Sequence, residues 1–390
     1  MEKILRTAAV AALIAGLGTL PAVAEDTIKV GVLVGYSGIG SLSGQQTDAT
    51  IKLFQQKYGD APGGHKIEFV RRDTTGPNPE VAKRLVQEVI TREKVRIMIG
   101  PDFTPNTLAA APIVNEAKVP TFVIGAATTG IIGEKSPYFT RTFFAIPQLC
   151  KPLASYAVKN NWKRVYVMVA DFAPGHDCEK YFLAALSEAG GTSAGNVRIP
   201  LSNPEFSAYM QRIKDAKPDA LFIFMPIGEP SLGALRAATD SGLKASGAKI
   251  MGTGDITDEP YVDAIGDAAV DVLTTGIYST QHPSELNKEF VKEYVALNGK
   301  SPRIGWTNVA VWDALRLMYD GLNAQAGTSF DPDKFMAFVR GRSLESPRGP
   351  VSIDKGNGDI TQNVYIRRAE KIDGLLQNVE VETLPNQAFK

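Results

Sequence analysis

Short runs of apolar and β-branched residues alternate with longer amphipathic stretches along the first third of the chain. The series begins with a predicted strand at residues 28–34 and a predicted helix at 44–58, and it reaches a fourth strand at 120–124. Strands that alternate with helices form a parallel sheet with right-handed crossover connections. Residues 25–145 are therefore predicted to fold as an α/β lobe.

The same alternation starts again after Pro147 and continues to residue 277. Extended segments such as 138–145 cross between the two series, and such segments suit a hinge better than a flexible tether does. The sequence therefore predicts an α/β fold with two Rossmann-like lobes, each with a parallel central sheet, joined by a multi-strand hinge. The predicted boundaries are residues 25–145 with 280–347 for lobe 1, and residues 146–279 with 348–390 for lobe 2.

The N-terminus has the pattern of a secretory signal peptide. Lys3 and Arg6 precede an uncharged run at residues 7–20, and Ala22-Val23-Ala24 forms an A-x-A cleavage site. The run is about 14 residues long, which is shorter than the roughly 20 residues that cross a bilayer. Residues 1–24 are therefore predicted to be cleaved, leaving a soluble protein in the periplasm.

The charge and the cysteine content of the chain limit which partners and which cellular compartment are expected. The chain has 42 basic and 42 acidic residues, so a nucleic acid or a charged membrane is not an expected partner. Cys150 and Cys178 are its only cysteines, and the oxidising periplasm permits one disulfide between them. Spacing alone does not bring two Cα atoms within bridging distance, so two separate buried thiols remain the alternative.

A glycine- and serine-rich loop at residues 35–44 follows the first predicted strand, and Asp73 ends the second. This layout is typical of a dinucleotide-binding fold, but Gly38, Gly40 and Gly44 are one residue too widely spaced for G-x-G-x-x-G. A loop of this kind before a helix still offers N–H and hydroxyl donors to an anionic group.

Two further polar loops, residues 100–107 and 125–130, follow the third and fourth predicted strands. The carboxyl ends of parallel strands open into one crevice, so all three loops are expected to converge there. Ordinary turn and helix-cap chemistry is the alternative explanation for each loop taken alone.

The sequence offers little for catalysis. His65, His176 and His282 are scattered without the spacing of a zinc site, and no G-x-S-x-G motif is present. The acids at residues 354–359 lack the bidentate glutamate of a calcium loop and are better explained as the turn of a hairpin at 351–366. We therefore expect no enzyme activity, no metal and no cofactor.

Several motifs, taken in order along the chain, resemble the leucine/isoleucine/valine-binding protein family, which comprises type I periplasmic binding proteins of ABC importers. The resemblance covers essentially the whole mature chain and rests on Ile28-Lys29-Val30-Gly31-Val32, Tyr36-Ser37-Gly38, Gly100 before Thr104, Gly125-Ala126-Ala127-Thr128, Ala170-Asp171 before Gly175, Pro204-Glu205-Phe206, Pro218-Asp219-Ala220 and Ile265-Gly266-Asp267-Ala268-Ala269.

The resemblance implies that first-lobe loops hold a ligand carboxylate and that the second lobe supplies aromatic side chains and an acid for an α-ammonium group. Asp255 or Glu229 is the acid that the resemblance implies, but the tyrosines typical of amino-acid binders are missing at residues 172–174 and 227–229. The expected ligand-binding residues are Tyr36, Ser43, Phe103, Thr104, Ala126, Ala127, Thr128, Phe172, Gly228 and Asp255, with Trp306 as a further aromatic candidate.

The resemblance implies the periplasmic substrate-binding component of an ABC importer. It would capture a branched-chain or similar apolar amino acid by hinge closure, as a monomer that delivers its ligand to a membrane permease. A receptor for an aromatic or other small organic carboxylate is the first alternative. A periplasmic sensor and an exported enzyme are the others.

Overall fold

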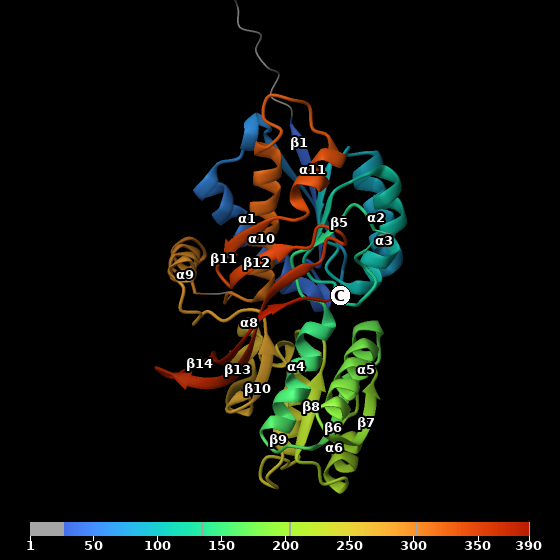
Figure 1. The fold of residues 1–390 in the computed structure, drawn as a ribbon, viewed down its shortest axis with the longest axis vertical. Coiled ribbons are helices and arrows are strands. Elements are labelled where there is room, and N and C mark those ends of the chain that lie inside the picture. Colours follow the sequence, from blue (N-terminus) through green and yellow to red (C-terminus); the bar gives the residue numbers. More distant parts are fainter. Residues whose placement is uncertain (1–26, 134–135, 203, 301–302, 390) are drawn as a thin grey trace, which may run out of the picture.

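A parallel sheet with the strand order β2-β1-β3-β4-β5 forms the centre of the first lobe, at the top of Figure 1. The computed structural model describes residues 27–133, 136–202, 204–300 and 303–389, so the predicted signal peptide lies outside it. The elements of this part are β1 (Ile28–Val34), α1 (Ser41–Tyr58), β2 (Ile67–Asp73), α2 (Pro79–Thr91), β3 (Ile97–Ile99), α3 (Thr104–Ala117), β4 (Thr121–Val123) and β5 (Phe139–Arg141).

The second lobe repeats this plan, with parallel strands in the order β7-β6-β8-β9-β10. It lies in the lower half of Figure 1. Its elements are α4 (Ile146–Lys159), β6 (Arg164–Ala170), α5 (Ala173–Glu188), β7 (Thr192–Ile199), α6 (Phe206–Asp215), β8 (Ala220–Phe224), α7 (Glu229–Asp240), β9 (Lys249–Thr253), α8 (Glu259–Ile265) and β10 (Leu273–Gly276). The predicted α/β fold with two parallel sheets is confirmed.

The chain then returns to the first lobe through α9 (Glu285–Asn298), α10 (Trp306–Asn323) and α11 (Pro332–Val339). Aromatic side chains join α10 to α1, because the Phe54 ring lies 5.0 Å from Trp312 and 4.9 Å from Tyr319. Such edge-to-face pairs add to the stabilisation that comes from burying apolar area.

Antiparallel strands connect the two lobes. β13 (Ile360–Ile372) pairs with β10 of the second lobe, and also with β12 (Gly349–Ile353) and β14 (Leu375–Gln387). β11 (Ser343–Ser346) pairs with β12, so the lobe boundary predicted at residue 347 falls inside a hairpin of this hinge sheet. The predicted hairpin at residues 351–366 corresponds to β12 and β13, whereas the sequence did not predict β11, β14 or α8.

A buried ion pair fastens the first lobe to these hinge strands. Arg348, in the β11–β12 turn, donates from Nε and Nη2 to Asp313 Oδ2 of α10 at 2.9 and 2.6 Å. Its Nη1 donates to Gln362 of β13 at 2.9 Å, and Nη2 also reaches the Thr142 carbonyl. A charge at 1% exposure is tolerated only when it is paired in this way.

Within the described part of the chain, no helix has both the length and the apolar character needed to cross a membrane.

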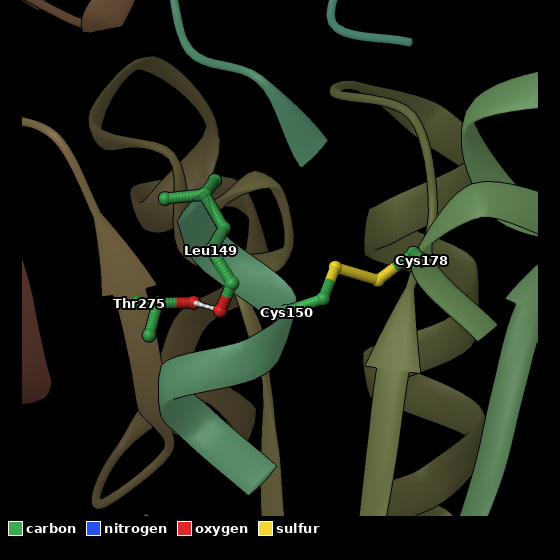
Figure 2. Close-up of a disulfide and its surroundings, with 4 residues drawn as sticks. All are labelled: Leu149, Cys150, Cys178 and Thr275. Atoms are coloured by element: carbon green, nitrogen blue, oxygen red, sulfur yellow. Dashed lines mark hydrogen bonds between the residues drawn. A yellow bond between two sulfur atoms is a disulfide. The ribbon is translucent and has the colours of Figure 1, made fainter. Parts of the chain in front are cut away.

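A disulfide joins Cys150 of α4 to Cys178 of α5 (Figure 2), with 5.6 Å between their Cα atoms. Beside it, the Thr275 hydroxyl of β10 donates to the Leu149 carbonyl at 2.9 Å. Both sulfur-bearing residues are fully buried. The two contacts hold α4 against both its neighbouring helix and the sheet.

We expect the disulfide to stabilise the second lobe by about 3 kcal/mol, because a cross-link over 28 residues restricts the unfolded chain. The double variant Cys150→Ala/Cys178→Ala should therefore unfold at lower urea concentration than the wild type. Alkylation and mass spectrometry of protein isolated without reductant should find no free thiol. Two alkylated cysteines, or an unchanged urea midpoint, would contradict this.

Candidate functional site

A cavity of about 110 Å³ lies between the lobes, at the carboxyl ends of the parallel strands. Three first-lobe loops reach it, and they contribute Ser43 after β1, Thr104 after β3 and Ala127 after β4. The second lobe contributes the segments that follow β6, β8 and β9. Six strand ends therefore border one crevice, as expected for parallel sheets.

Asp102 anchors the first-lobe loops to one another. Its Oδ2 accepts from the Gly35 N–H at 2.9 Å, and its Oδ1 accepts from the Thr74 hydroxyl at 3.3 Å. Gly125 must lack a side chain here, because a Cβ would lie 2.4 Å from the Asp102 carbonyl oxygen. The loops that follow β1, β3 and β4 are thus packed backbone to backbone.

The first-lobe side of the cavity presents hydrogen-bond donors without a positive charge. Thr104 begins the 14-residue helix α3, and its buried hydroxyl has no hydrogen-bond partner in the described chain. Ser43 also lines the cavity, close to the start of α1. None of the described residues that line the cavity is Lys, Arg or His. Neutral hydroxyls and helix N-termini with free N–H groups suit a carboxylate at this end.

Aromatic side chains from both lobes and from the crossing segment line the cavity. Phe172 and Phe224 of the second lobe stack with 6.0 Å between ring centroids and 9° between ring planes. Phe143 and Phe144, in the segment that crosses between the lobes, pack at 4.3 Å. Phe103 adds a further ring from the first lobe. A planar apolar ligand would be enclosed between rings from both lobes and the crossing segment.

Two buried acids, Asp255 and Asp258, line the second-lobe side of the cavity at 7% and 3% exposure. Burial raises the pKa of Asp255 to about 6 and that of Asp258 to about 8, and the nearby Arg367 only partly offsets this. Burial also raises the pKa of Asp102 to about 6. The cavity is therefore apolar along its walls and acidic at its second-lobe end.

No group of His, Cys, Asp and Glu side chains in the described residues is arranged to hold a metal ion. Aromatic walls with a few convergent polar groups are typical of small-molecule sites. A cavity of about 150 Å³ holds one benzene ring, so this one, of the same order, suits a ligand of similar size.

The periplasmic binding protein family profile matches residues 27–374. The chain belongs to this family. It is 38% identical to Leu/Ile/Val-binding protein homolog 6 of Brucella melitensis over 93% of both chains.

Two solved solute-binding proteins of ABC transporters from Rhodopseudomonas palustris are also similar. One, in complex with 4-hydroxybenzoate, is 44% identical with a TM-score of 0.90. The other, from strain BisB5 in complex with 3,4-dihydroxybenzoic acid, is 41% identical with a TM-score of 0.88. Both matches cover 93% of this chain and 98% of the solved chain. The periplasmic binding protein fold predicted from the sequence is confirmed, as is its role as a solute-binding component of ABC transporters.

The structure brings six of the predicted site residues of this binding protein to the cavity. They are Ser43, Phe103, Thr104, Ala127, Phe172 and Asp255. The other four do not line it, namely Tyr36, Ala126, Thr128 and Gly228.

Each of these four has another place in the binding protein. Tyr36 packs its ring on Gly44 and donates its hydroxyl to Asp48 at 3.1 Å. Ala126 is fully buried, and the Thr128 carbonyl accepts from Arg141 at 3.1 Å. Gly228 precedes α7 at a φ of 103°, a conformation that favours glycine.

Trp306, the further aromatic candidate, is fully buried behind Phe144, with 5.3 Å between the rings. Glu229, the alternative acid, begins α7 and does not line the cavity.

Sequence reasoning missed several residues that line the cavity: Gln46, Asp102, Phe143, Phe144, Phe224, Asp258 and Tyr261. Asp102 lies inside a loop that the sequence did single out. Phe224 ends a predicted strand, a position that could have marked it. Tyr261 belongs to the short helix α8, which the sequence did not predict, and Asp258 directly precedes this helix.

We expect Asp258 to lower the stability of the ligand-free binding protein as pH rises. The pKa of Asp258 is about 8 in the folded protein, whereas its ordinary value is 3.8. As pH rises between these two values, the unfolded chain loses the proton and the folded protein keeps it, so the free energy of unfolding falls over this range. We therefore expect Asp258→Asn to raise the melting temperature, with a difference from wild type that grows between pH 4 and pH 8. The exposed Asp240 offers the control Asp240→Asn, which should change little. A melting temperature lowered at pH 8 would contradict this.

Proposed function

We propose that this chain captures a small aromatic carboxylate in the periplasm, as the substrate-binding component of an ABC importer. The observation that carries the proposal is the wall of aromatic rings, above all the stacked pair Phe172 and Phe224. A flat ring bound among such side chains gains both from burial and from ring contacts.

The carboxylate of the ligand binds to the first-lobe loops. Thr104 offers a buried hydroxyl with no partner in the described chain, and the start of α3 offers backbone N–H groups. A hydrogen bond to an ionised carboxylate in an enclosed cleft is stronger than one between neutral groups. The first lobe can therefore hold an anion without a basic side chain.

The two solved relatives support this assignment of ligand class. The proteins crystallised with 4-hydroxybenzoate and 3,4-dihydroxybenzoic acid are 44% and 41% identical to this chain. Hydroxybenzoates are flat anions of one ring. Their shape suits the aromatic walls, and their carboxylate suits the neutral donors at the first-lobe end.

Ligand capture proceeds by closure of the two lobes about the hinge strands. A ligand shifts such an equilibrium only through contacts that differ between the open and closed states. Here the first lobe contacts the carboxylate and the second lobe contacts the ring, so only the closed state makes both sets of contacts.

A branched-chain or similar apolar amino acid is the second candidate. Asp255 at the second-lobe end could accept from an α-ammonium group, and the Brucella relative is named a Leu/Ile/Val-binding homolog. The lining phenylalanines would then contact an aliphatic side chain.

The remaining parts of the proposal follow from the sequence. The signal peptide is removed after Ala24, the mature protein works as a monomer with a membrane permease, and the ligand is released chemically unchanged. The lobes comprise residues 25–145 with 280–347 and residues 146–279 with 348–390, apart from the hinge hairpin.

Calorimetry and thermal shift with 4-hydroxybenzoate and leucine test the proposed ligand class. We expect 4-hydroxybenzoate to bind and to raise the melting temperature, since a ligand that binds only the folded state stabilises it. Thr104→Val should weaken this binding about tenfold, because it removes one hydroxyl donor to a charged group. The exposed Thr91 provides the control Thr91→Val, which should not change it.

Stabilisation by leucine alone would overturn the aromatic assignment in favour of the second candidate. Chromatography of the ligand after incubation should recover it unchanged. Steady conversion to a product would contradict the receptor role itself.

A further inference from the structure

The two ends of the cavity differ in the hydrogen bonds that they can make. The first-lobe end offers the Thr104 hydroxyl, which has no partner in the described chain, and the acid there, Asp102, already accepts from Gly35 and Thr74. The second-lobe end has the carboxyl groups of Asp255 and Asp258. We propose that Asp255 and Asp258 form a subsite that requires a hydroxyl group on the ligand, at the end opposite its carboxylate. This inference rests on the proposed function and specifies the aromatic ligand further.

One carboxylate oxygen of each acid has no hydrogen-bond partner within the described chain. Asp255 Oδ2 and Asp258 Oδ1 are both buried, and no donor reaches either atom. Buried polar atoms are normally hydrogen-bonded, and each exception requires an explanation. Because both side chains line the cavity, a group of the bound ligand can supply the missing hydrogen bonds to these two oxygens.

The charged groups near the acids make most of their hydrogen bonds elsewhere, although Arg367 Nε has no partner among the described residues. Arg367 of β13 donates from Nη1 to the Tyr278 carbonyl at 2.6 Å and from Nη2 to the Thr274 hydroxyl at 3.2 Å. Glu259 accepts from Asn378 and pairs with Arg303 at 3.0 Å. Arg367 thus offsets part of the negative charge without occupying the hydrogen-bonding positions of the two acids.

The backbone holds the acids in place. Gly254 packs so closely that a Cβ there would lie 2.0 Å from Arg367 Nη2 and 2.1 Å from the Trp306 ring. Asp255 follows directly, and Asp258 precedes α8. A buried polar site that matches a hydroxyl group of its ligand rejects an analogue that lacks this hydroxyl.

A hydroxyl group matches this pair better than a group with a donor alone. Burial raises the pKa of both acids, so the pair retains a proton more readily than two exposed carboxylates would. A phenolic hydroxyl can donate to an ionised carboxylate while it accepts from a protonated one. Tyr261 also lines the cavity.

A ligand with an unsubstituted ring would shield both acids from water without hydrogen-bonding to them. A buried polar group without a partner costs free energy, so such a ligand should bind more weakly. Benzoate and 4-fluorobenzoate carry the same carboxylate and ring as 4-hydroxybenzoate, and fluorine is close to hydroxyl in size but cannot donate. We expect calorimetry at pH 7 to show that both bind the wild-type protein at least tenfold more weakly than 4-hydroxybenzoate does.

Variants assign the preference to the two acids. Asp255→Ala and Asp258→Ala should each weaken 4-hydroxybenzoate at least tenfold while changing benzoate affinity less than threefold. A merely structural role would weaken both ligands together, so the ratio of the two affinities is the deciding readout. The control Asp240→Ala should leave the ratio unchanged.

The outcomes separate this inference from the proposed function. If no benzoate derivative binds, the aromatic assignment itself fails. If benzoate, 4-fluorobenzoate and 4-hydroxybenzoate bind the wild-type protein equally well, the site is an aromatic carboxylate site but the hydroxyl subsite is wrong. The wild-type comparison decides this even where a variant does not fold.

Discussion

Parallel strands that all end at one crevice are the constraint on which the rest of this structure depends. The loops after β1, β3 and β4 meet the segments after β6, β8 and β9 there, because every strand of a parallel sheet points its carboxyl end the same way. Residues far apart in the sequence thus face the same small volume. The glycines of the first-lobe loops let the backbones approach closely enough to close it, as at Gly125.

The two lobes contribute different kinds of chemical group to the site. The first lobe offers neutral donors, the crossing segment and second lobe supply rings, and the second-lobe end carries buried acids whose pKa values are raised by burial. Functional sites commonly retain groups that reduce stability. The buried ion pair of Arg348 and Asp313 fastens the hinge strands to the first lobe.

The sequence predicted most of the fold because strand and helix periodicities are local signals. It located Thr104 and Ala127 through the loops that follow strands, and Asp255 through family resemblance. It could not show that the Tyr36 hydroxyl donates to Asp48, because a sequence does not reveal in which direction a side chain points. Phe143 and Phe144 lie in a predicted crossing strand, and only the packing of the lobes reveals which face meets the cavity. The edge strand β14 has only two buried residues, Leu376 and Asn378, so its pattern predicted no core element.

The central claim is that one ligand spans the crevice with its carboxylate on the first lobe and its hydroxyl on the second. A crystal structure of the complex with 4-hydroxybenzoate tests this most directly. The account predicts the carboxylate at Thr104 and the start of α3, the ring among Phe143, Phe172 and Phe224, and the hydroxyl between Asp255 and Asp258. A ligand bound in the reverse orientation, or outside the crevice, would contradict it.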